Sequence, residues 1–245
     1  MRLHTSTWPE IEAYLKRCKG IIIPIGSTEQ HGPTGLVGCD AICAEEIAWE
    51  GGRRGDFLVA PTFNVGSAQH HMSFPGTMTL RPSTMTAVIT DWVLSLSAHG
   101  FTHIYFINGH GGNIAPVQAA FADIYARRAL DGDGADFIMK LQNWFDLPGL
   151  PELTEELYPA GAGSHATAAE ISVTFAAYPE KEDRRLLDPK IAPEGSITDK
   201  NRYRKDFPDG RIGSDPSQSN GADGQRLIDV AANALVADVQ VFFDS

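Results

Sequence analysis

The sequence has few cysteines and fewer basic than acidic residues. Its three cysteines are Cys18, Cys39 and Cys43, an odd set without a second Cys or His pair at zinc-finger spacing. This pattern argues against a disulfide framework and predicts reduced thiols in a cytoplasmic protein, with Cys39 most simply a buried small side chain. The chain has 20 Lys and Arg against 31 Asp and Glu, a formal net charge of -11. That balance argues against a nucleic-acid partner and against an anionic membrane surface.

Long apolar runs, internal repeats and low-complexity tracts are also missing. No run approaches the roughly 20 apolar residues that a membrane-spanning helix needs, and the first residues show no signal-peptide pattern. We therefore expect no membrane partner. No stretch has the composition of a linker, and 245 residues are enough to bury a substantial core, so the sequence predicts a single domain over residues 1–245.

Strand-like and helix-like segments alternate along most of the chain. The patterns predict strands at 20–25, 57–60, 103–107 and 136–140, and helices near 8–17, 40–51, 83–98, 113–128, 165–177 and 222–242. Such alternation favours an α/β fold with a mostly parallel sheet covered on both faces. The stretch 179–224 is rich in Pro, Gly and charged residues. An irregular segment of that length is either functional or disordered, and we expect it to pack on a neighbouring subunit or to close over a site.

One polar turn, Asn108-Gly109-His110-Gly111-Gly112-Asn113, follows the predicted strand 103–107 and precedes a helix. It places His110 at the carboxyl end of a strand, where parallel α/β sheets bind ligands. The glycines, including Gly111, leave room for a metal or substrate to approach the backbone. A tight turn with an exposed histidine is an equally good interpretation of this turn taken alone.

A second segment runs from the apolar residues 21–25 through a polar turn to Asp40. Glu29 and His31 are two residues apart, so in extended geometry their side chains lie on the same face. Asp40 stands at the start of a predicted helix, and taken alone it is more simply a helix cap than a ligand.

A third segment, residues 163–172, is predicted to be a loop that passes into a helix of small residues. Ser164 is the expected cap of that helix. His165 in the loop and Glu170 in the first turns would both reach a cleft at the amino end of the helix. The alternative for Glu170 is a solvated position on a surface helix, which its apolar neighbours disfavour.

Together these segments offer two imidazoles and three carboxylates, on Glu29, His31, Asp40, His110 and Glu170. A mixed nitrogen and oxygen donor set suits zinc, manganese or iron better than calcium. Five ligands are more than one catalytic zinc normally takes. They suit two divalent metals that share a bridging carboxylate, each with an open position for water or substrate.

These motifs, with Phe74-Pro75-Gly76-Thr77 and the late Gly213-Ser214-Asp215-Pro216, resemble those of the creatininase (creatinine amidohydrolase) family. The resemblance runs from about residue 5 to the carboxyl end. It implies a three-layer α/β/α sandwich, a dinuclear metal centre, hydrolysis of an amide-type C–N bond and a homohexamer built from dimers.

By position, the resemblance assigns Glu29, His31, Asp40 and His110 as metal ligands, with Asp40 bridging, and it places Glu170 at the centre. Two positions differ from the members that hydrolyse creatinine. Gly112 stands where those members have a glutamate ligand, so we expect Glu170 to complete the second metal site. Gly161 and its small neighbours stand where those members have a tryptophan that packs on the creatinine ring, which weakens the case for creatinine.

We expect two divalent metals to activate water and to polarise the amide carbonyl of a small-molecule substrate. His165 is the expected proton shuttle, or alternatively a partner that orients Glu170. His70 and His71 lie in a loop expected to line the pocket, and Trp144 resembles a pocket aromatic, although a core or interface position fits it equally well. We expect His4, His99 and His103 at the surface or at strand edges.

Three functions remain open from the sequence. The first is hydrolysis of creatinine or a related small amide. A formamide deformylase or a peptide-trimming enzyme of the same family would share every ligand and differ in the loops 66–76 and 141–163. A non-catalytic carbohydrate- or metabolite-binding protein would carry the same side chains as ordinary polar residues.

Overall fold

The computed structural model describes residues 1–132 and 134–245 and contains a parallel sheet. Its strands are β1 (Gly20–Ile25), β2 (His103–Asn108) and β3 (Ile138–Asn143), in the order β1-β2-β3. Gly20 lies opposite His103, and His103 lies opposite Ile138. The strands expected at 20–25 and 103–107 are confirmed, whereas the third strand starts two residues later than expected and runs on to 143.

The predicted strand at 57–60 is wrong as a regular strand. This segment lies beside β1, but it pairs with it only through isolated bridges, one between Val59 and Ile22 and a second at Phe63. Between these two bridges, a continuous ladder would need a hydrogen bond donated by the main-chain N–H of residue 24. Pro24 has no N–H. The segment therefore extends the sheet beyond β1 without forming a continuous ladder.

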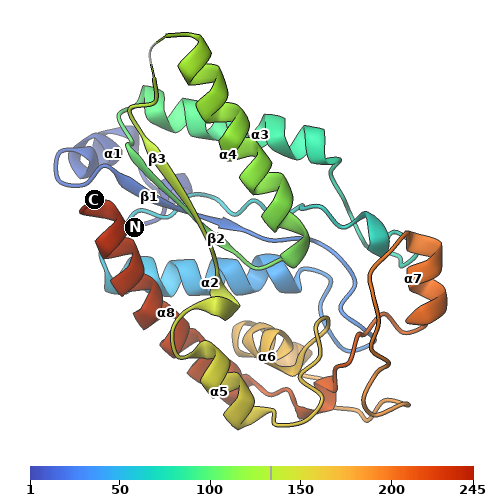
Figure 1. Cartoon of the computed structure of the whole chain (residues 1–245). Helices are drawn as coiled ribbons and strands as arrows, with labels where there is room; N and C mark the ends of the chain where they lie inside the picture. The colour runs from blue at the N-terminus through green and yellow to red at the C-terminus, as the bar shows by residue number, and fades with distance from the viewer. Residues whose placement is uncertain (133) are drawn as a thin grey trace.

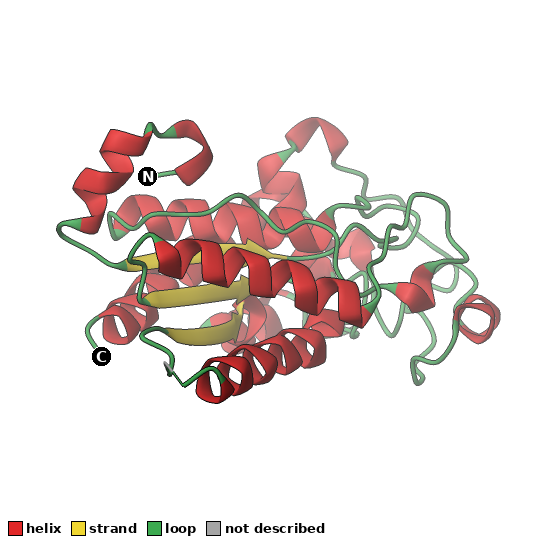
Figure 2. Cartoon of the chain, turned by 90° about the horizontal axis from the view of Figure 1, so that it is seen from above, coloured by secondary structure: helices red, strands yellow, loops and turns green. Residues whose placement is uncertain are grey.

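Helices cover both faces of the sheet (Figures 1 and 2). One face packs against α3 (Pro82–Ala98) and α4 (Ile114–Leu130), with α1 (Trp8–Leu15) beside them. The other face packs against α2 (Cys39–Arg54) and α8 (Gly221–Phe243). This arrangement confirms the three-layer α/β/α sandwich with a parallel central sheet.

The residues of β1 alternate between the two cores. Ile21, Ile23 and Ile25 belong to the cluster under α3 and α4, while Ile22 belongs to the cluster under α2 and α8. All six residues of the strand are buried. A strand covered on both faces needs apolar side chains at every position, which is why the sequence shows a continuous run of isoleucines.

The second half of the chain contains helices α5 (Leu150–Leu157), α6 (Ala168–Ala177) and α7 (Lys200–Asp206). The helix expected from 165 begins at 168, and the patterns did not predict α5 or α7. Helix α7 lies within the stretch 179–224, which is therefore not wholly irregular, and it packs against the single turn η2 (Gln69–His71). Among the described residues, no helix combines the length and the apolar character that crossing a membrane requires.

Candidate metal centre

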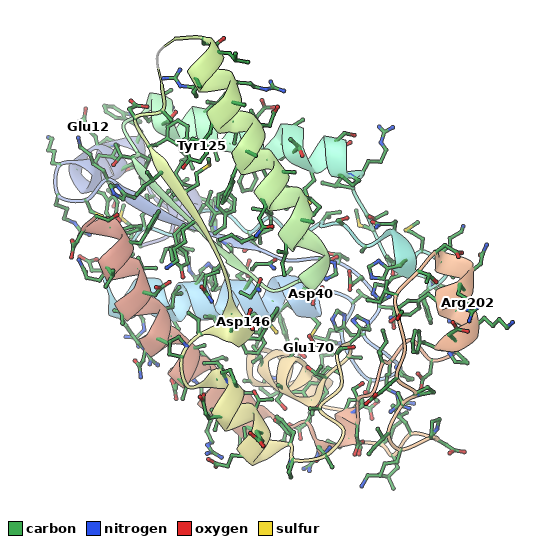
Figure 3. All side chains as sticks on the ribbon, in the orientation of Figure 1. Glu12, Asp40, Tyr125, Asp146, Glu170 and Arg202 are labelled. Atoms are coloured by element: carbon green, nitrogen blue, oxygen red, sulfur yellow. The ribbon has the colours of Figure 1, made fainter. Side chains whose placement is uncertain are left out.

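The five predicted ligands meet where β1 and β2 end. Glu29 and His31 follow β1, and His110 follows β2. Asp40 comes from the first turn of α2 and Glu170 from the first turn of α6, and Figure 3 shows these two labelled residues on neighbouring helices. The fold thus brings together residues that are up to 141 positions apart in the sequence, as Glu29 and Glu170 are.

Two glycines let the His110 turn approach the rest of the site. A Cβ on Gly109 would lie 2.1 Å from the main-chain oxygen of Asp40, and one on Gly112 would lie 2.4 Å from His110 Nε2. Contacts this short leave no space for a side chain. Close packing therefore explains why residue 112 is a glycine. A glutamate at this position would require the turn to move.

Asp40 is not a helix cap, so that interpretation is wrong. Helix α2 begins at Cys39 with Gly38 as its N-cap, and the Asp40 side chain turns to two histidines instead. Its Oδ1 lies 3.1 Å from His31 Nε2, and its Oδ2 lies 3.1 Å from His110 Nδ1. A carboxylate that divides its two oxygens between two imidazoles has the arrangement that a bridging ligand needs.

The tautomer of His31 follows from its backbone contact. His31 Nδ1 lies 3.0 Å from the main-chain oxygen of Glu29, which can only accept, so Nδ1 carries the hydrogen. Nε2 then faces Asp40 Oδ1 at 3.1 Å and Glu170 Oε1 at 3.9 Å. A nitrogen lone pair between two carboxylates needs a proton or a metal cation to make this arrangement favourable.

His110 shows the same pattern. Its Nε2 donates to the main-chain oxygen of Ser67 at 3.0 Å, which leaves Nδ1 beside Asp40. Among the described residues, Asp40 Oδ2 and Glu29 Oε1 are buried oxygens without a hydrogen-bond partner. Buried carboxylate oxygens without a hydrogen bond, beside imidazole nitrogens, fit a cation bound among them.

The electrostatics of the cluster favour positive charge. Burial alone would lower the pKa of His110, but Glu29 and Asp40 raise it to about 9. Burial also opposes the charged form of His31, yet Asp40 and Glu170 raise its pKa well above the usual value. Burial would raise the pKa of Asp40, but the two histidines lower it below its usual range. A site that attracts protons this strongly also attracts divalent cations, which displace them.

Four groups of ligand atoms lie within 4.8 Å of one another among the described residues. Two of them are Glu29-Asp40-His110 and His31-Cys39-Glu170, and the other two join Glu29 to His31 and His165 and to His70 and His71. Asp40 contacts histidines of the two groups named first. Cys39 is buried, as expected, and burial raises the pKa of its thiol well above the usual value. It is therefore a poor ligand, because metals bind the thiolate.

Glu170 is fixed by a capping box. The N–H of Thr167 donates to Glu170 Oε1 at 2.6 Å, and the N–H of Glu170 donates to Thr167 Oγ1 at 3.3 Å. Thr167 is thus the N-cap of α6, and the assignment of Ser164 as the cap is wrong. The interpretation of Glu170 as a solvated surface residue is also wrong, because its side chain is only 15% exposed and its carboxylate is held by Thr167. Burial raises the pKa of this carboxyl.

His165 contacts Gln30 rather than Glu170. Its Nε2 donates to the main-chain oxygen of Gln30 at 2.8 Å, and its Nδ1 lies 3.9 Å from Glu29 Oε1. The alternative in which His165 orients Glu170 is not supported, since Glu170 is held by Thr167 instead. Burial, His31 and His71 lower the pKa of His165 well below its usual value.

The sequence patterns missed Gln30, which connects the histidines. Its Oε1 accepts from the N–H of Gly32 at 2.9 Å, which fixes the orientation of the amide. Its Nε2 lies 2.9 Å from His71 Nδ1 and 2.9 Å from the main-chain oxygen of Gly210. The position of Gln30 between the candidate ligands Glu29 and His31 is a sequence signal that it belongs to the site. Its contact partners, however, are distant in the sequence.

Tyr203 was also missed. It lies on α7, its ring meets the His71 ring edge-on at 4.6 Å between centroids, and its hydroxyl donates to the main-chain oxygen of Gly210 at 2.8 Å. This contact brings part of the stretch 179–224 next to His71. Whether the stretch closes over the site or packs on a neighbouring subunit stays a prediction. No periodicity in a short, charged helix indicates such a position.

A cavity of about 770 Å³ lies beside the ligands. The predicted pocket residues His70, His71, Gly111 and Trp144 all line it. His71 Nε2 lies 3.1 Å from Glu29 Oε1, and burial with the neighbouring His71 lowers the pKa of His70 to about 4. Trp144 also belongs to the buried core, so both interpretations of this residue hold. His4 and His99 are exposed and His103 is half-buried, as expected.

Comparisons with known proteins agree with this geometry. The family model for creatininase, described as creatinine amidohydrolase, matches residues 4–239. The creatinine amidohydrolase of Pseudomonas putida is 27% identical over 193 residues, which cover 74% of this chain and 74% of that protein. The mycofactocin precursor peptide peptidase of Mycolicibacterium smegmatis is 32% identical over 108 residues, 42% of this chain and 43% of that protein. A solved Zn–Zn form of a creatininase variant superposes with a TM-score of 0.85 at 23% identity and covers 100% of this chain and 98% of its own.

Proposed function

This chain belongs to the creatininase family and is a hydrolase of carbon–nitrogen amide bonds, and we propose that it hydrolyses a small amide at a centre of two divalent metal ions. The observation that carries the proposal is the position of Asp40, whose two oxygens each lie 3.1 Å from a different histidine. The similar structure in a Zn–Zn form supports two ions in this fold.

The donor atoms divide into two sets that share Asp40. Glu29, Asp40 and His110 would hold one ion, and His31, Asp40 and Glu170 would hold the other. Zinc, manganese and iron all accept such a mixed set. When bound, such ions supply an activated water and polarise the amide carbonyl.

We propose that His165 moves the proton. Its Nε2 hydrogen is held by the main-chain oxygen of Gln30, so its unprotonated Nδ1 lies on the side of Glu29. The lowered pKa of His165 favours the neutral ring, whose free Nδ1 would take up the proton from the attacking water only transiently. The same atom then delivers that proton to the leaving nitrogen of the amide.

His71 has a different role, because Gln30 sets the opposite tautomer in it. Gln30 Nε2 donates to His71 Nδ1 at 2.9 Å, so the hydrogen of His71 is on Nε2, 3.1 Å from Glu29 Oε1. An N–H in this position cannot coordinate an ion. His71 therefore steadies the Glu29 carboxylate and walls the cavity.

The substrate is a small-molecule amide. Creatinine itself is disfavoured because Gly112 and Gly161 replace a ligand and an aromatic platform of the creatinine-hydrolysing members. A peptide-trimming activity is the second candidate, and the similarity to the mycofactocin precursor peptide peptidase favours it. A formamide deformylase would use the same ligands. By family resemblance we also propose a homohexamer, which light scattering on the purified protein would test.

The direct test is the metal content per chain of protein purified without chelator, with activity on creatinine and on simple formamides measured on the same sample. We expect about two divalent metals per chain, and fewer after Glu29→Gln or His110→Ala. Protein that stays metal-free after incubation with zinc or manganese would overturn the proposal and would favour a non-catalytic binding protein.

A further inference from the structure

The cavity is larger than the metal ligands require. It extends from them to a second wall that comes from the turn η4 (Trp144–Asp146), helix α5, the loop that follows it and the segment after α6. The apolar members of this far wall are Trp144, Phe145, Pro151, Tyr158, Pro159, Ala162 and Ile197. Helix α5 packs against α8, as Figure 1 shows.

Two of these apolar residues keep exposed surface in the protein. The side chain of Phe145 is 38% exposed and that of Ile197 is 52% exposed, although both line the cavity. Apolar surface that faces a concave site beside reactive groups is typical of a ligand contact. The rest of this wall is firmly held, since Trp144 and Tyr158 are buried.

The volume indicates the size of the ligand. About 770 Å³ falls within the range of roughly 300–1,000 Å³ that encloses extended organic ligands, whereas creatinine is one small ring. Gly161 does not line the cavity. It has a φ of +71°, and a Cβ there would lie 2.9 Å from Asp215 Cβ, so this position disfavours an aromatic side chain.

The charged side chains that line the cavity indicate that the ligand has no anionic group. Among the described residues that line the cavity there is no lysine or arginine, and the only acidic side chain on the far wall is Glu155. A carboxylate on the substrate would be desolvated there without a counter-charge.

We propose that this cavity selects amides that carry an extended apolar or aromatic substituent without an anionic group, and that the substituent lies between Trp144 and Ala162. The inference rests on the proposed hydrolase function, because it places the scissile amide at the metal ligands. Among small-molecule amides, it predicts that those without such a substituent and those with a free carboxylate are poor substrates.

The test uses hydroxamates, whose chelating head binds a metal centre whatever the natural scissile bond is. Acetohydroxamate, 4-phenylbutyryl hydroxamate and the same compound with a para-carboxylate are titrated by calorimetry into protein of measured metal content. We expect the phenyl compound to bind at least about tenfold tighter than acetohydroxamate, from burial of the ring. The para-carboxylate should remove that gain.

Three variants test which side chains of the cavity cause the differences in hydroxamate affinity. Ala162→Trp fills the space beside Trp144 and should bring the ratio of the two affinities close to one. Glu155→Gln should restore part of the binding of the para-carboxylate compound. Glu152→Gln is the matched control, because Glu152 is exposed on the same helix and does not line the cavity.

The outcomes separate the two proposals. If the metal-loaded protein binds no hydroxamate at all, the metal-dependent function itself fails. If acetohydroxamate and the phenyl compound bind equally well, or if the para-carboxylate binds best, the hydrolase function stands and the substrate inference is overturned.

Discussion

At the scale of single residues, the site is defined by buried carboxylates that lie against imidazoles. Asp40 is 3% exposed and Glu29 is fully buried, and each keeps one oxygen without a hydrogen bond among the described residues. A buried carboxylate of this kind is unfavourable unless a cation neutralises it, either a protonated imidazole or a metal ion. The pattern is therefore more informative than the presence of acidic residues near histidines.

The first prediction separates the bridging carboxylate from a terminal one. Asp40→Asn should lose both ions, because both donor sets include Asp40, whereas Glu170→Gln should retain about one ion per chain. Metal content after equilibrium dialysis measures the difference. Glu12→Gln, an exposed change on α1, is the control and should keep the full content. Equal losses in the Asp40 and Glu170 variants would contradict the bridging assignment.

The second prediction concerns Gln30. In Gln30→Glu the amide donor becomes a carboxylate that only accepts, so the hydrogen of His71 should move from Nε2 to Nδ1. We expect the turnover number to fall by roughly 10–100-fold with little change in metal content. A loss of this size is typical when a residue that hydrogen-bonds to a group of a metal site is replaced. Nitrogen-15 spectra of the histidine rings report the tautomers directly.

Gln69→Glu is the matched control for that experiment, since Gln69 is an exposed glutamine two residues before His71. It should leave both the ring spectra and the turnover near those of the unchanged protein. A Gln30 variant that loses turnover while the His71 tautomer stays the same would refute the role given to Gln30.

The five ligand candidates were predictable because they follow predicted strands or begin predicted helices, and the carboxyl ends of parallel strands meet at one edge of the sheet. Gln30 and Tyr203 were not predictable. Gln30 reaches Gly210 across 180 positions in sequence, and no local pattern reports such a contact.

At the scale of secondary structure, local hydrogen bonding explains why the predicted start of α6 and the predicted strand at 57–60 were wrong. The sequence contains the capping box Thr167-x-x-Glu170, yet Ser164 is also a good cap residue and precedes His165. Thr167 is the N-cap because its reciprocal pair of hydrogen bonds with Glu170 satisfies two backbone N–H groups. Pro24 similarly explains why the segment at 57–60 is not a regular strand.

The third prediction concerns the contact between α6 and α8. A Cβ on Gly224 would lie 1.9 Å from the main-chain oxygen of Ser172, so the helices cannot keep their distance if residue 224 has a side chain. Gly224→Ala should therefore lower the free energy of unfolding by about 1–3 kcal/mol, despite the better helix propensity of alanine. Urea unfolding followed by circular dichroism measures the change.

Gln225→Ala is the neighbouring control on the same helix, and its exposed position should keep the change within about 0.5 kcal/mol. A Gly224→Ala protein as stable as the original would show that α8 moves away from α6 at little cost. In that case the Glu170 carboxylate should also shift, because α6 carries it.

At the scale of the whole molecule, the layered architecture followed from the alternation of strands and helices, while the course of residues 179–224 did not. That stretch is held by Arg211, whose fully buried guanidinium donates to the main-chain oxygens of Pro189, Lys190 and Ser214. These contacts are specific to the folded chain. Composition alone, rich in Pro, Gly and charge, predicts only that the segment is irregular.

The last prediction links the metal centre to the stability of the whole chain. The ligands come from the ends of β1 and β2 and from the starts of α2 and α6, so bound ions would join four elements that the unfolded chain does not hold together. Ions present at 100 times their dissociation constant stabilise the folded state by about 2.7 kcal/mol per site. In a chain of this length about 1 kcal/mol shifts the Tm by roughly 2–4 °C.

We therefore expect zinc or manganese at both sites to raise the Tm by roughly 10–20 °C relative to the same protein in excess chelator, as measured by differential scanning calorimetry. Asp40→Asn should show no such response, because it removes the ligand common to both sets. If the original protein binds two ions and still melts at the same temperature in chelator, the ions would have to bind the unfolded chain equally well. A preformed site that draws its ligands from four elements excludes that outcome, so an unchanged Tm would place the bound ions elsewhere.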